Sequence, residues 1–167
     1  MTTPTVRDAT VDDLPQILWI HNDAIAHTTA IWDDEQVDLA DRAAWLHDRQ
    51  SSGRPVLVAE AADGSVAGYA SYGPWRTKSG YRHSVENSVY VHPDHRRAGH
   101  AATLVTALID HARGADVHAI VAGIEAGNAS SIALHERFGF GEVARMPQVG
   151  VKFGRWLDLV YLQLLLD

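Results

Sequence analysis

The stretch spanning residues 88–102 carries the clearest chemical signal in the chain. The run Val89, Tyr90 and Val91 is typical of a strand, and a helical pattern begins shortly after Gly99. A strand that leads through a glycine-containing turn into a helix N-terminus favours an anion, because the first helical amides have no partner and the helix dipole is positive there. Two cations, Arg96-Arg97, precede the glycine. The stretch predicts a pyrophosphate-binding turn, although the same letters could form a solvated turn.

The better-known phosphate loops are absent from the sequence. Neither G-x-G-x-x-G nor G-x-x-x-x-G-K-[ST] occurs. This disfavours a nucleotide-binding regulatory domain. The ten histidines are scattered and show no H-E-x-x-H or comparable ligand spacing, so no metal is expected.

Composition narrows the class of partner and the compartment. The 167 residues carry a formal net charge of −7, which argues against nucleic acid or an anionic membrane as the main partner. Cysteine is absent, which excludes disulfides and thiolate nucleophiles. No stretch resembles a signal peptide or a membrane span, so a cytoplasmic protein is expected.

The pattern of elements predicts a single mixed α/β (α+β) domain over residues 1–167. Helix starts are expected at Thr10 and Asp38, and a hairpin is expected around Asp63-Gly64. The strand of residues 84–91 follows a polar loop, and the last expected helix, at residues 128–138, ends at Gly139. The expected order is β-α-α-β-β-β-α-β-α-β-β, with helices flanking a mixed, mostly antiparallel central sheet.

Two motifs in this order resemble one enzyme superfamily. Residues 96–101, RRAGHA, resemble the R/Q-x-x-G-x-G/A signature of the GNAT acyl-CoA N-acetyltransferases. Residues 128–140, NASSIALHERFGF, resemble the second signature, N-x-x-[AS]-x-x-L-[YH]-x-x-x-G-F. Two signatures at the right separation are far more specific than either alone.

A closer resemblance covers essentially the whole chain. The segments TTAIW (28–32), GPW (73–75), SVENSVYV (84–91) and KFGRWLD (152–158) resemble the phosphinothricin, methionine sulfone and methionine sulfoximine N-acetyltransferases. The resemblance implies acetyl-CoA as donor, the α-amine of a small amino-acid analogue as acceptor, and a homodimer. The chain departs from the usual pattern at Ala101, His100 and Asn87, and the last of these puts the acceptor preference in doubt.

Two residues are candidate catalysts in the light of this resemblance. Glu86 takes the position of the general base, with Trp75 and Tyr90 expected beside it, although it could be a plain strand glutamate facing solvent. His135 takes the position where many superfamily members have a tyrosine general acid. It could equally be a packed helix histidine.

Binding residues follow from the same motifs. Main-chain amides of the strand at residues 89–91 are expected to meet the oxyanion and the pantetheine amides. The acetyl-CoA candidates are Val89, Tyr90, Val91, Arg96, Arg97, Ala98, Gly99, His100, Ala101, Ala102 and Asn128. The acceptor candidates are Thr29, Ile31, Trp32, Trp75, Arg76, Arg82, Glu86 and Asn87.

Other functions stay open at this point. The same fold could acetylate a peptide N-terminus or a polyamine, and an acidic open groove would favour such cationic acceptors. A different class is a non-catalytic acyl-CoA sensor, which would bind the thioester and release no thiol. The sequence favours direct acetyl transfer to a small amino acid without a covalent enzyme intermediate.

Overall fold

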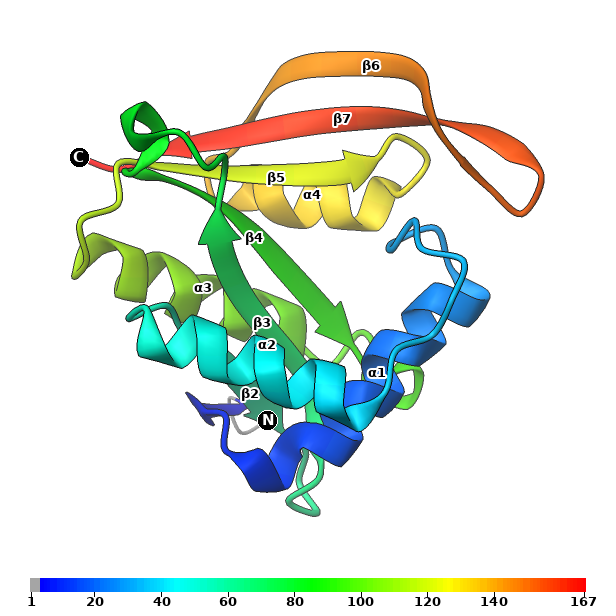
Figure 1. Ribbon diagram of the computed structural model, residues 1–167, viewed down its shortest axis with the longest axis vertical. Helices are drawn as coiled ribbons and strands as arrows, with labels where there is room; N and C mark the ends of the chain where they lie inside the picture. Colours follow the sequence, from blue (N-terminus) through cyan, green and yellow to red (C-terminus); the bar gives the residue numbers. More distant parts are fainter. Residues whose placement is uncertain (1–3) are drawn as a thin grey trace.

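The computed structural model describes residues 4–167 as one seven-stranded mixed sheet covered by four helices (Figure 1). The sheet order is β1-β2-β3-β4-β5-β7-β6, and every neighbouring pair is antiparallel except β4 and β5. The elements in chain order are β1 (Thr5–Asp8), α1 (Leu14–His27), α2 (Leu39–Ser51), β2 (Val56–Glu60), β3 (Val66–Pro74), β4 (Ser84–Val91), α3 (His100–Arg113), β5 (Ala119–Glu125), α4 (Ala129–Arg137), β6 (Gly141–Lys152) and β7 (Arg155–Leu165). This confirms the expected fold class and element order.

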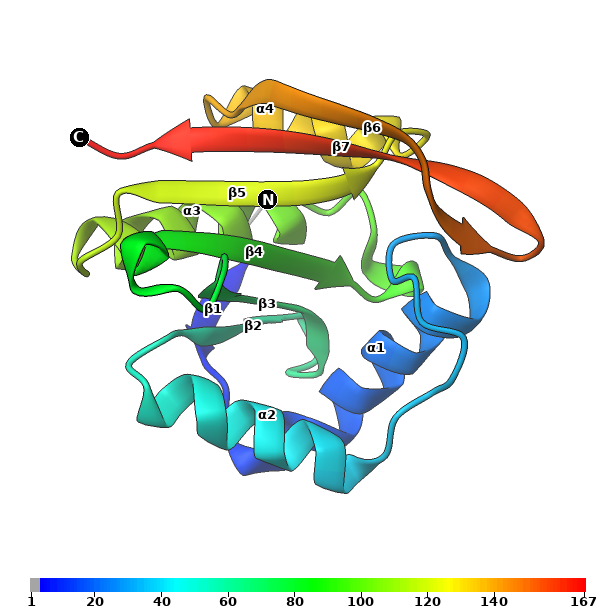
Figure 2. The same ribbon diagram turned by 45° about the horizontal axis from the view of Figure 1, so that its top comes forward.

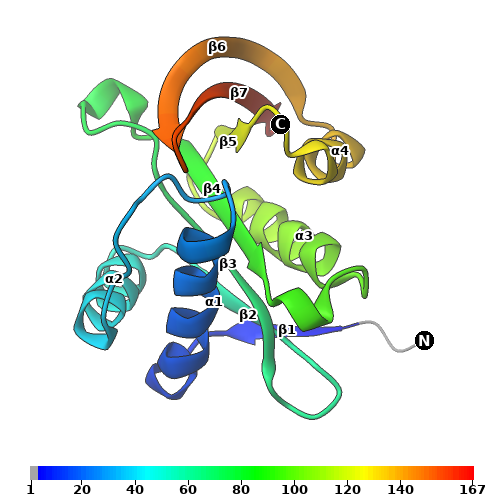
Figure 3. The ribbon, with the colours of Figure 1, turned by 90° about the vertical axis from the view of Figure 1, so that its right-hand side faces the viewer.

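The helices cover the two faces of the sheet in pairs, α1 with α2 and α3 with α4 (Figures 2 and 3). Apolar residues of α3 such as Leu104 and Leu108 are buried in the larger core cluster. Ile17 of α1 and Leu46 of α2 are buried in a second cluster on the other face. Residues that alternate along a strand therefore face two different helix pairs, which decides where each side chain of β4 points.

The two parallel strands of the sheet separate soon after they meet. β4 and β5 pair only over Ser84–Glu86 with Ala119–Val121, although both strands continue well beyond. The rest of β4 stays paired with β3, and β5 stays paired with β7 along its whole length. Figure 1 shows the two strands moving apart toward the N-terminal end of α3. The separation leaves one edge of β4 without a strand partner.

The helix starts agree with the sequence in part. Asp13 accepts a hydrogen bond from the Thr10 amide at 2.8 Å, but a 3₁₀ turn, Val11–Asp13, precedes α1. Asp38 caps α2 by accepting from the Asp41 amide at 2.8 Å. Leu39, the first residue of α2, is 47% exposed. The arginines Arg42 and Arg49 share the inner side of that helix, which hydrophobic periodicity does not reveal.

The last two strands form a long exposed hairpin. All but two residues of β6 are exposed, and β6 lies at the edge of the sheet. β6 has 12 residues and β7 has 11, and Lys152 at the end of β6 is buried. Among the described residues, none of the helices has the length and apolarity needed to cross a bilayer.

Candidate active site

A groove of about 1120 Å³ opens where β4 and β5 separate. Its walls come from the end of α1, the outer part of β4, the turn before α3, the start of α4 and the β6–β7 connection. The described residues that line it include Thr29, Val89, Tyr90, Val91, Arg96, Arg97, Gly99, His100, Ala101, Ala102, Glu125, Asn128, Phe153 and Arg155. Nearly all the acetyl-CoA candidates thus lie on one surface, with Ala98 the exception.

The turn before α3 has the backbone of an anion cradle. Gly99 is the helix N-cap with φ +86°, and Arg97 also has a positive φ of 62°. The first helical amides, from His100 to Ala102, point out of the helix end because no preceding turn supplies their acceptors. Arg96 and Arg97 are exposed beside them. Partial positive charge and two exposed cations together suit a pyrophosphate.

His100 is the unusual member of this cradle. It is 7% exposed, and its Nδ1 is buried without a hydrogen-bond partner in the described part of the chain. Burial and the nearby His95 lower its pKa, so the ring is neutral at pH 7. The cradle therefore keeps its backbone donors and gains no charge from this histidine.

The free edge of β4 presents alternate amides to the groove. The His92 amide donates to Ala67 at 2.8 Å, toward β3, while the Ala119 amide donates to the carbonyl of His83, toward β5. Because backbone direction alternates along a strand, Val89 and Val91 direct their amides into the gap, and Tyr90 directs its amide toward β3. The expected oxyanion and pantetheine donors are thus narrowed to Val89 and Val91.

Glu86 lies at the last point of contact between the two strands. It pairs with Gly73 on one side and with Val121 on the other. Burial raises the pKa of its carboxyl group, and the guanidinium of Arg76 opposes that rise. Its Oε1 lies 3.4 Å from the position that a Cβ on Gly123 would occupy, so the glycine of β5 makes room for the carboxylate. A half-buried carboxylate beside the strand gap has the environment of a general base.

The polar loop brings only one of its two arginines toward Glu86. The Arg76 guanidinium lies 3.8 Å from the centre of the Trp75 ring and acts electrostatically on Glu86. Trp75 in turn meets the ring of Tyr161 edge to face at 5.1 Å. Arg82 is exposed and donates to the Ser79 carbonyl of its own loop. Arg76 and Trp75 therefore remain acceptor candidates, while no contact links Arg82 to the site.

Asn87 and His135 contact each other on the opposite face of β4 from Glu86. His135 is 4% exposed; its Nδ1 lies 2.8 Å from the Ser131 carbonyl and its Nε2 lies 3.1 Å from Asn87 Nδ2. Burial lowers its pKa, so the ring is neutral, with Nδ1 as donor and Nε2 as acceptor. The ring carries no free proton for a leaving thiolate. This arrangement favours the packed-histidine alternative, and it places Asn87 away from the expected acceptor side.

The segment after α1 joins the groove to the β6–β7 hairpin. Thr29 lines the groove and its hydroxyl lies 3.3 Å from Glu125 Oε2. Trp32 donates from Nε1 to the Thr29 carbonyl at 2.8 Å, and its ring covers Gly150 of β6. Ile31 is 9% exposed and belongs to a small core cluster. Of the three expected pocket residues, only Thr29 lies on the groove surface.

Lys152 fastens this segment, and sequence reasoning assigned it no role. It is 2% exposed, and its ammonium donates to the carbonyls of Ile25, Thr28 and Ile31, the Thr28 bond being 2.8 Å. The first two carbonyls lie at the C-terminus of α1, where the helix dipole is negative. In the sequence, the one indication of a role for Lys152 is its place in KFGRWLD, a segment that resembles the related acetyltransferases. Glu125, which joins Thr29 to the start of α4, was also missed.

Asn128 fulfils its expected capping role. Its Oδ1 accepts from the Ser131 amide at 3.2 Å and so begins α4. The residue also lines the groove. Its side-chain nitrogen, Nδ2, donates no hydrogen bond within residues 4–167. Asn128 can therefore cap α4 and contact a ligand at the same time.

These features occur together in one known family. The model of the Acetyltransferase (GNAT) family matches residues 14–140, which include both signature segments and the strand gap. The chain belongs to this family. It is therefore an acetyl-CoA-dependent N-acetyltransferase by family membership.

Individual members of the family are similar over the full length. The L-methionine sulfoximine/L-methionine sulfone acetyltransferase of Pseudomonas aeruginosa is 56% identical over 98% of this chain and 95% of its own. The Salmonella typhimurium acetyltransferase yncA, solved with its cofactor acetyl-CoA, is 52% identical with a TM-score of 0.96, over 99% of this chain and 95% of its own. A ribosomal-protein-alanine N-acetyltransferase of Brucella melitensis is 54% identical with a TM-score of 0.95, over 97% and 99% of the two chains.

We predict that Lys152→Met loosens the wall formed by the segment after α1. The variant leaves three carbonyls without their buried donor, so unfolding free energy should fall by about 1–3 kcal/mol in urea titrations. KM for the amine acceptor should rise more than KM for acetyl-CoA, because the cradle before α3 is untouched. Arg113→Met, an exposed change on α3, is the control and should alter neither quantity. Full stability and unchanged KM in Lys152→Met would show that the lysine fastens nothing.

Proposed function

We propose that this N-acetyltransferase transfers the acetyl group of acetyl-CoA to the α-amine of a small L-amino-acid analogue of the methionine sulfone or methionine sulfoximine type. The single observation that carries the proposal is the half-buried Glu86 at the point where β4 leaves β5, beside a groove that ends at the α3 cradle. The full-length similarity to the Pseudomonas aeruginosa enzyme supports this acceptor class. Phosphinothricin belongs to the same class of acceptor by the resemblance noted in the sequence.

The donor is proposed to lie along the groove with its pyrophosphate at the start of α3. Arg96, Arg97 and the amides of residues 99–102 then meet the phosphate oxygens. The pantetheine arm follows the free edge of β4, where the Val89 and Val91 amides can pair with it as an added strand would. This route brings the thioester to the strand gap, next to Glu86. The similarity to yncA, whose structure contains acetyl-CoA, supports the same placement.

The proposed reaction is a direct attack of the amine on the thioester. Glu86 takes a proton from the acceptor ammonium, directly or through water, and the neutral nitrogen attacks the carbonyl carbon. The oxygen of the tetrahedral intermediate is stabilised by a backbone amide of β4. The C–S bond then breaks, and the second amine proton passes, directly or through water, to the departing sulfur, so that CoA leaves as the thiol and the new amide remains. No enzyme nucleophile takes part.

The Brucella melitensis relative supports a second candidate, acetylation of a protein N-terminal alanine. The two candidates differ in what they require beside the amine: a free amino acid brings a carboxylate, while a peptide brings a neutral amide and a long chain. Arg76 near Glu86 favours the anionic acceptor. We further propose that the enzyme acts in the cytoplasm and without a metal, as the sequence predicts.

The function is tested by CoA-thiol release from acetyl-CoA with a set of acceptors: methionine sulfone, methionine sulfoximine, phosphinothricin, an alanine-terminated peptide and spermidine. We expect turnover with the first three compounds and little with the last two. Turnover confined to the peptide would replace the amino-acid proposal with the N-terminal one. No thiol release with any compound, while acetyl-CoA still binds in calorimetry, would support the sensor instead.

We predict that Glu86→Gln lowers kcat by roughly 10²- to 10⁴-fold, because a neutral amide cannot take the proton. Acetyl-CoA affinity should be unchanged. In the unaltered enzyme, kcat/KM should fall as the pH drops through the raised pKa of Glu86, because the base works only when ionised. Glu86→Gln should lose that acid limb of the profile. An unchanged rate, or an acid limb that survives the substitution, would remove Glu86 from the reaction.

We also propose that the chain forms a homodimer through the β6–β7 hairpin. This hairpin and its turn carry a set of seven exposed large apolar side chains, which a monomer would leave in water. The members are Val143, Met146, Val149, Val151, Phe153, Trp156 and Leu165. The family resemblance implies a dimer, and these exposed apolar side chains offer a surface through which it forms.

The dimer predicts a specific mutational result. Trp156→Glu, at a residue 68% exposed, should convert the protein to a monomer in sedimentation velocity, because it places a charge in the proposed contact. Val11→Glu changes an equally exposed apolar residue on the far 3₁₀ turn and should leave the mass unchanged. A monomeric parent protein at micromolar concentration would contradict the proposal.

A further inference from the structure

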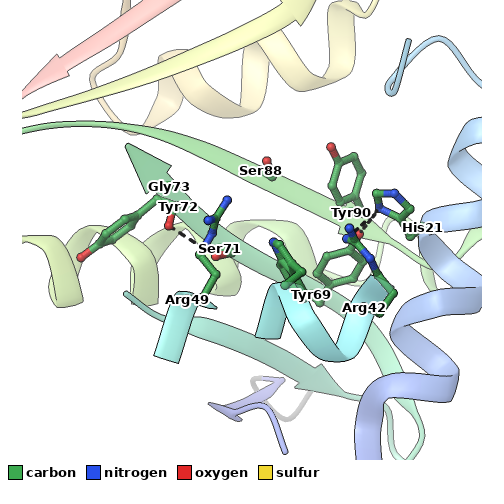
Figure 4. A pocket seen from close by; sticks show the side chains of 10 residues that line it. His21, Arg42, Arg49, Tyr69, Ser71, Tyr72, Gly73, Ser88 and Tyr90 are labelled. Atoms are coloured by element: carbon green, nitrogen blue, oxygen red, sulfur yellow. Dashed lines mark hydrogen bonds between the residues drawn. The ribbon is translucent and has the colours of Figure 1, made fainter. Parts of the chain in front are cut away.

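A second, smaller cavity of about 190 Å³ lies between α2 and the strands β3 and β4 (Figure 4). Two arginines of α2, Arg42 and Arg49, extend toward the strands in this view. Among the described residues that line the cavity none is acidic, and the other polar side chains are those of His21, two serines and three tyrosines. A cavity with two guanidinium groups, hydroxyls and no carboxylate is suited to a small anion.

The cavity follows β3 and β4 as far as Gly73, the strand partner of the proposed base Glu86. β3 and β4 present three cross-strand pairs to α2: Tyr69 with Tyr90, Ser71 with Ser88, and Gly73 with Glu86. Five of these six residues line the cavity, and the remaining one is Glu86. Directly opposite residues of an antiparallel pair lie about 5 Å apart, so an anion held over Gly73 is one such spacing from Glu86.

Arg49 is placed over that glycine. A Cβ on Gly73 would lie 2.6 Å from Arg49 Nη2, so the guanidinium occupies the space that a side chain would fill. Its Nε is buried and has no partner within residues 4–167, and its one carboxylate partner, Asp48 at 3.1 Å, is largely exposed. Burial lowers the pKa of Arg49, which remains charged at neutral pH. The guanidinium is thus a cation without a buried counter-charge.

The other charges around the cavity are already matched. Arg42 pairs with Asp41 at 2.7 Å and lies over the ring of Trp45. His21 shares a 2.9 Å contact with the Tyr69 hydroxyl, and burial lowers its pKa to about 4, so it is neutral. Glu86 leans toward Gly123 of β5 rather than toward Arg49. Arg49 is therefore the cation of this cavity with capacity for a further anion.

We infer that Arg49 binds the α-carboxylate of the acceptor while its α-amine faces Glu86. The inference rests on the proposed function and deepens it, since it assigns the acceptor class to free α-amino acids. In an α-amino acid, one carbon separates the amine from the carboxylate, so the two groups need partners only a few ångströms apart. Glu86 and the guanidinium over Gly73 meet this need. A peptide N-terminus carries no carboxylate there and gains nothing from Arg49.

The test compares each acceptor with the same molecule lacking its carboxylate. The pair is L-methionine sulfone and 3-(methylsulfonyl)propan-1-amine, assayed with the parent enzyme, Arg49→Gln and Arg49→Lys. We expect Arg49→Gln to raise KM for methionine sulfone about 10- to 100-fold, the loss typical of a charged hydrogen-bond pair, and Arg49→Lys to lose less. KM for the amine and for acetyl-CoA should stay the same. Arg113→Gln on the exposed side of α3 is the matched control.

Two kinetic results would overturn the inference. An equal loss with both acceptors would show that Arg49 only supports the fold. No loss with either acceptor would show that another residue binds the carboxylate. Arg76→Gln, assayed in the same way, tests Arg76 in that role. Calorimetry of L-methionine sulfone with the CoA-bound protein separates this question from turnover. Binding that Arg49→Gln abolishes sustains the carboxylate site even if no acetyl transfer occurs, and binding that the variant leaves intact refutes it.

Discussion

The early separation of β4 from β5 is the constraint on which the rest of the structure depends. Each strand keeps its other partner, β3 for β4 and β7 for β5, so the sheet stays intact while a gap opens inside it. Unpaired strand amides are costly to bury, and here they face a groove that a ligand can enter. The same gap brings the starts of α3 and α4 to one surface. The free edge of β4, the shared surface at the starts of α3 and α4, and the position of Glu86 thus all follow from this one interruption in strand pairing.

Charge is distributed so that opposite groups serve the site without cancelling each other. A carboxylate next to an arginine would have a lowered pKa and would be a weak base at neutral pH. The pKa of Glu86 is raised all the same, because burial outweighs the opposing effect of Arg76; its carboxylate leans toward Gly123, while Arg49 lies over Gly73 on the neighbouring strand. Two glycines, one on each side of Glu86, therefore give the acid and the cation separate places. The net charge of −7 says nothing of this arrangement, because the site depends on a few local groups.

The sequence predicted what depends on local pattern and missed what depends on contacts between distant segments. The strand at Ser84–Val91, the cap at Asn128 and the Gly99 turn are set by neighbouring residues and were found. Lys152 meets the carbonyl of Ile25 across 127 positions, and no pattern in either segment announces that contact. Asn87 and Glu86 are adjacent in sequence, yet strand alternation sends them to opposite faces. The family resemblance assigns a role to a position in the sequence, but only the fold shows on which face of the sheet that side chain lies.

The β6–β7 hairpin links the interior of the site to the outer surface of the molecule. Lys152 and Gly150 hold the segment after α1 from within, while Val151 and Trp156, beside them in sequence, are exposed. An edge hairpin this long, with this many exposed apolar side chains, is typical of a surface that another chain covers. A partner that covered its outer side would therefore stiffen the inner contacts as well. Assembly would in this way tighten the wall of the groove without adding any residue to it.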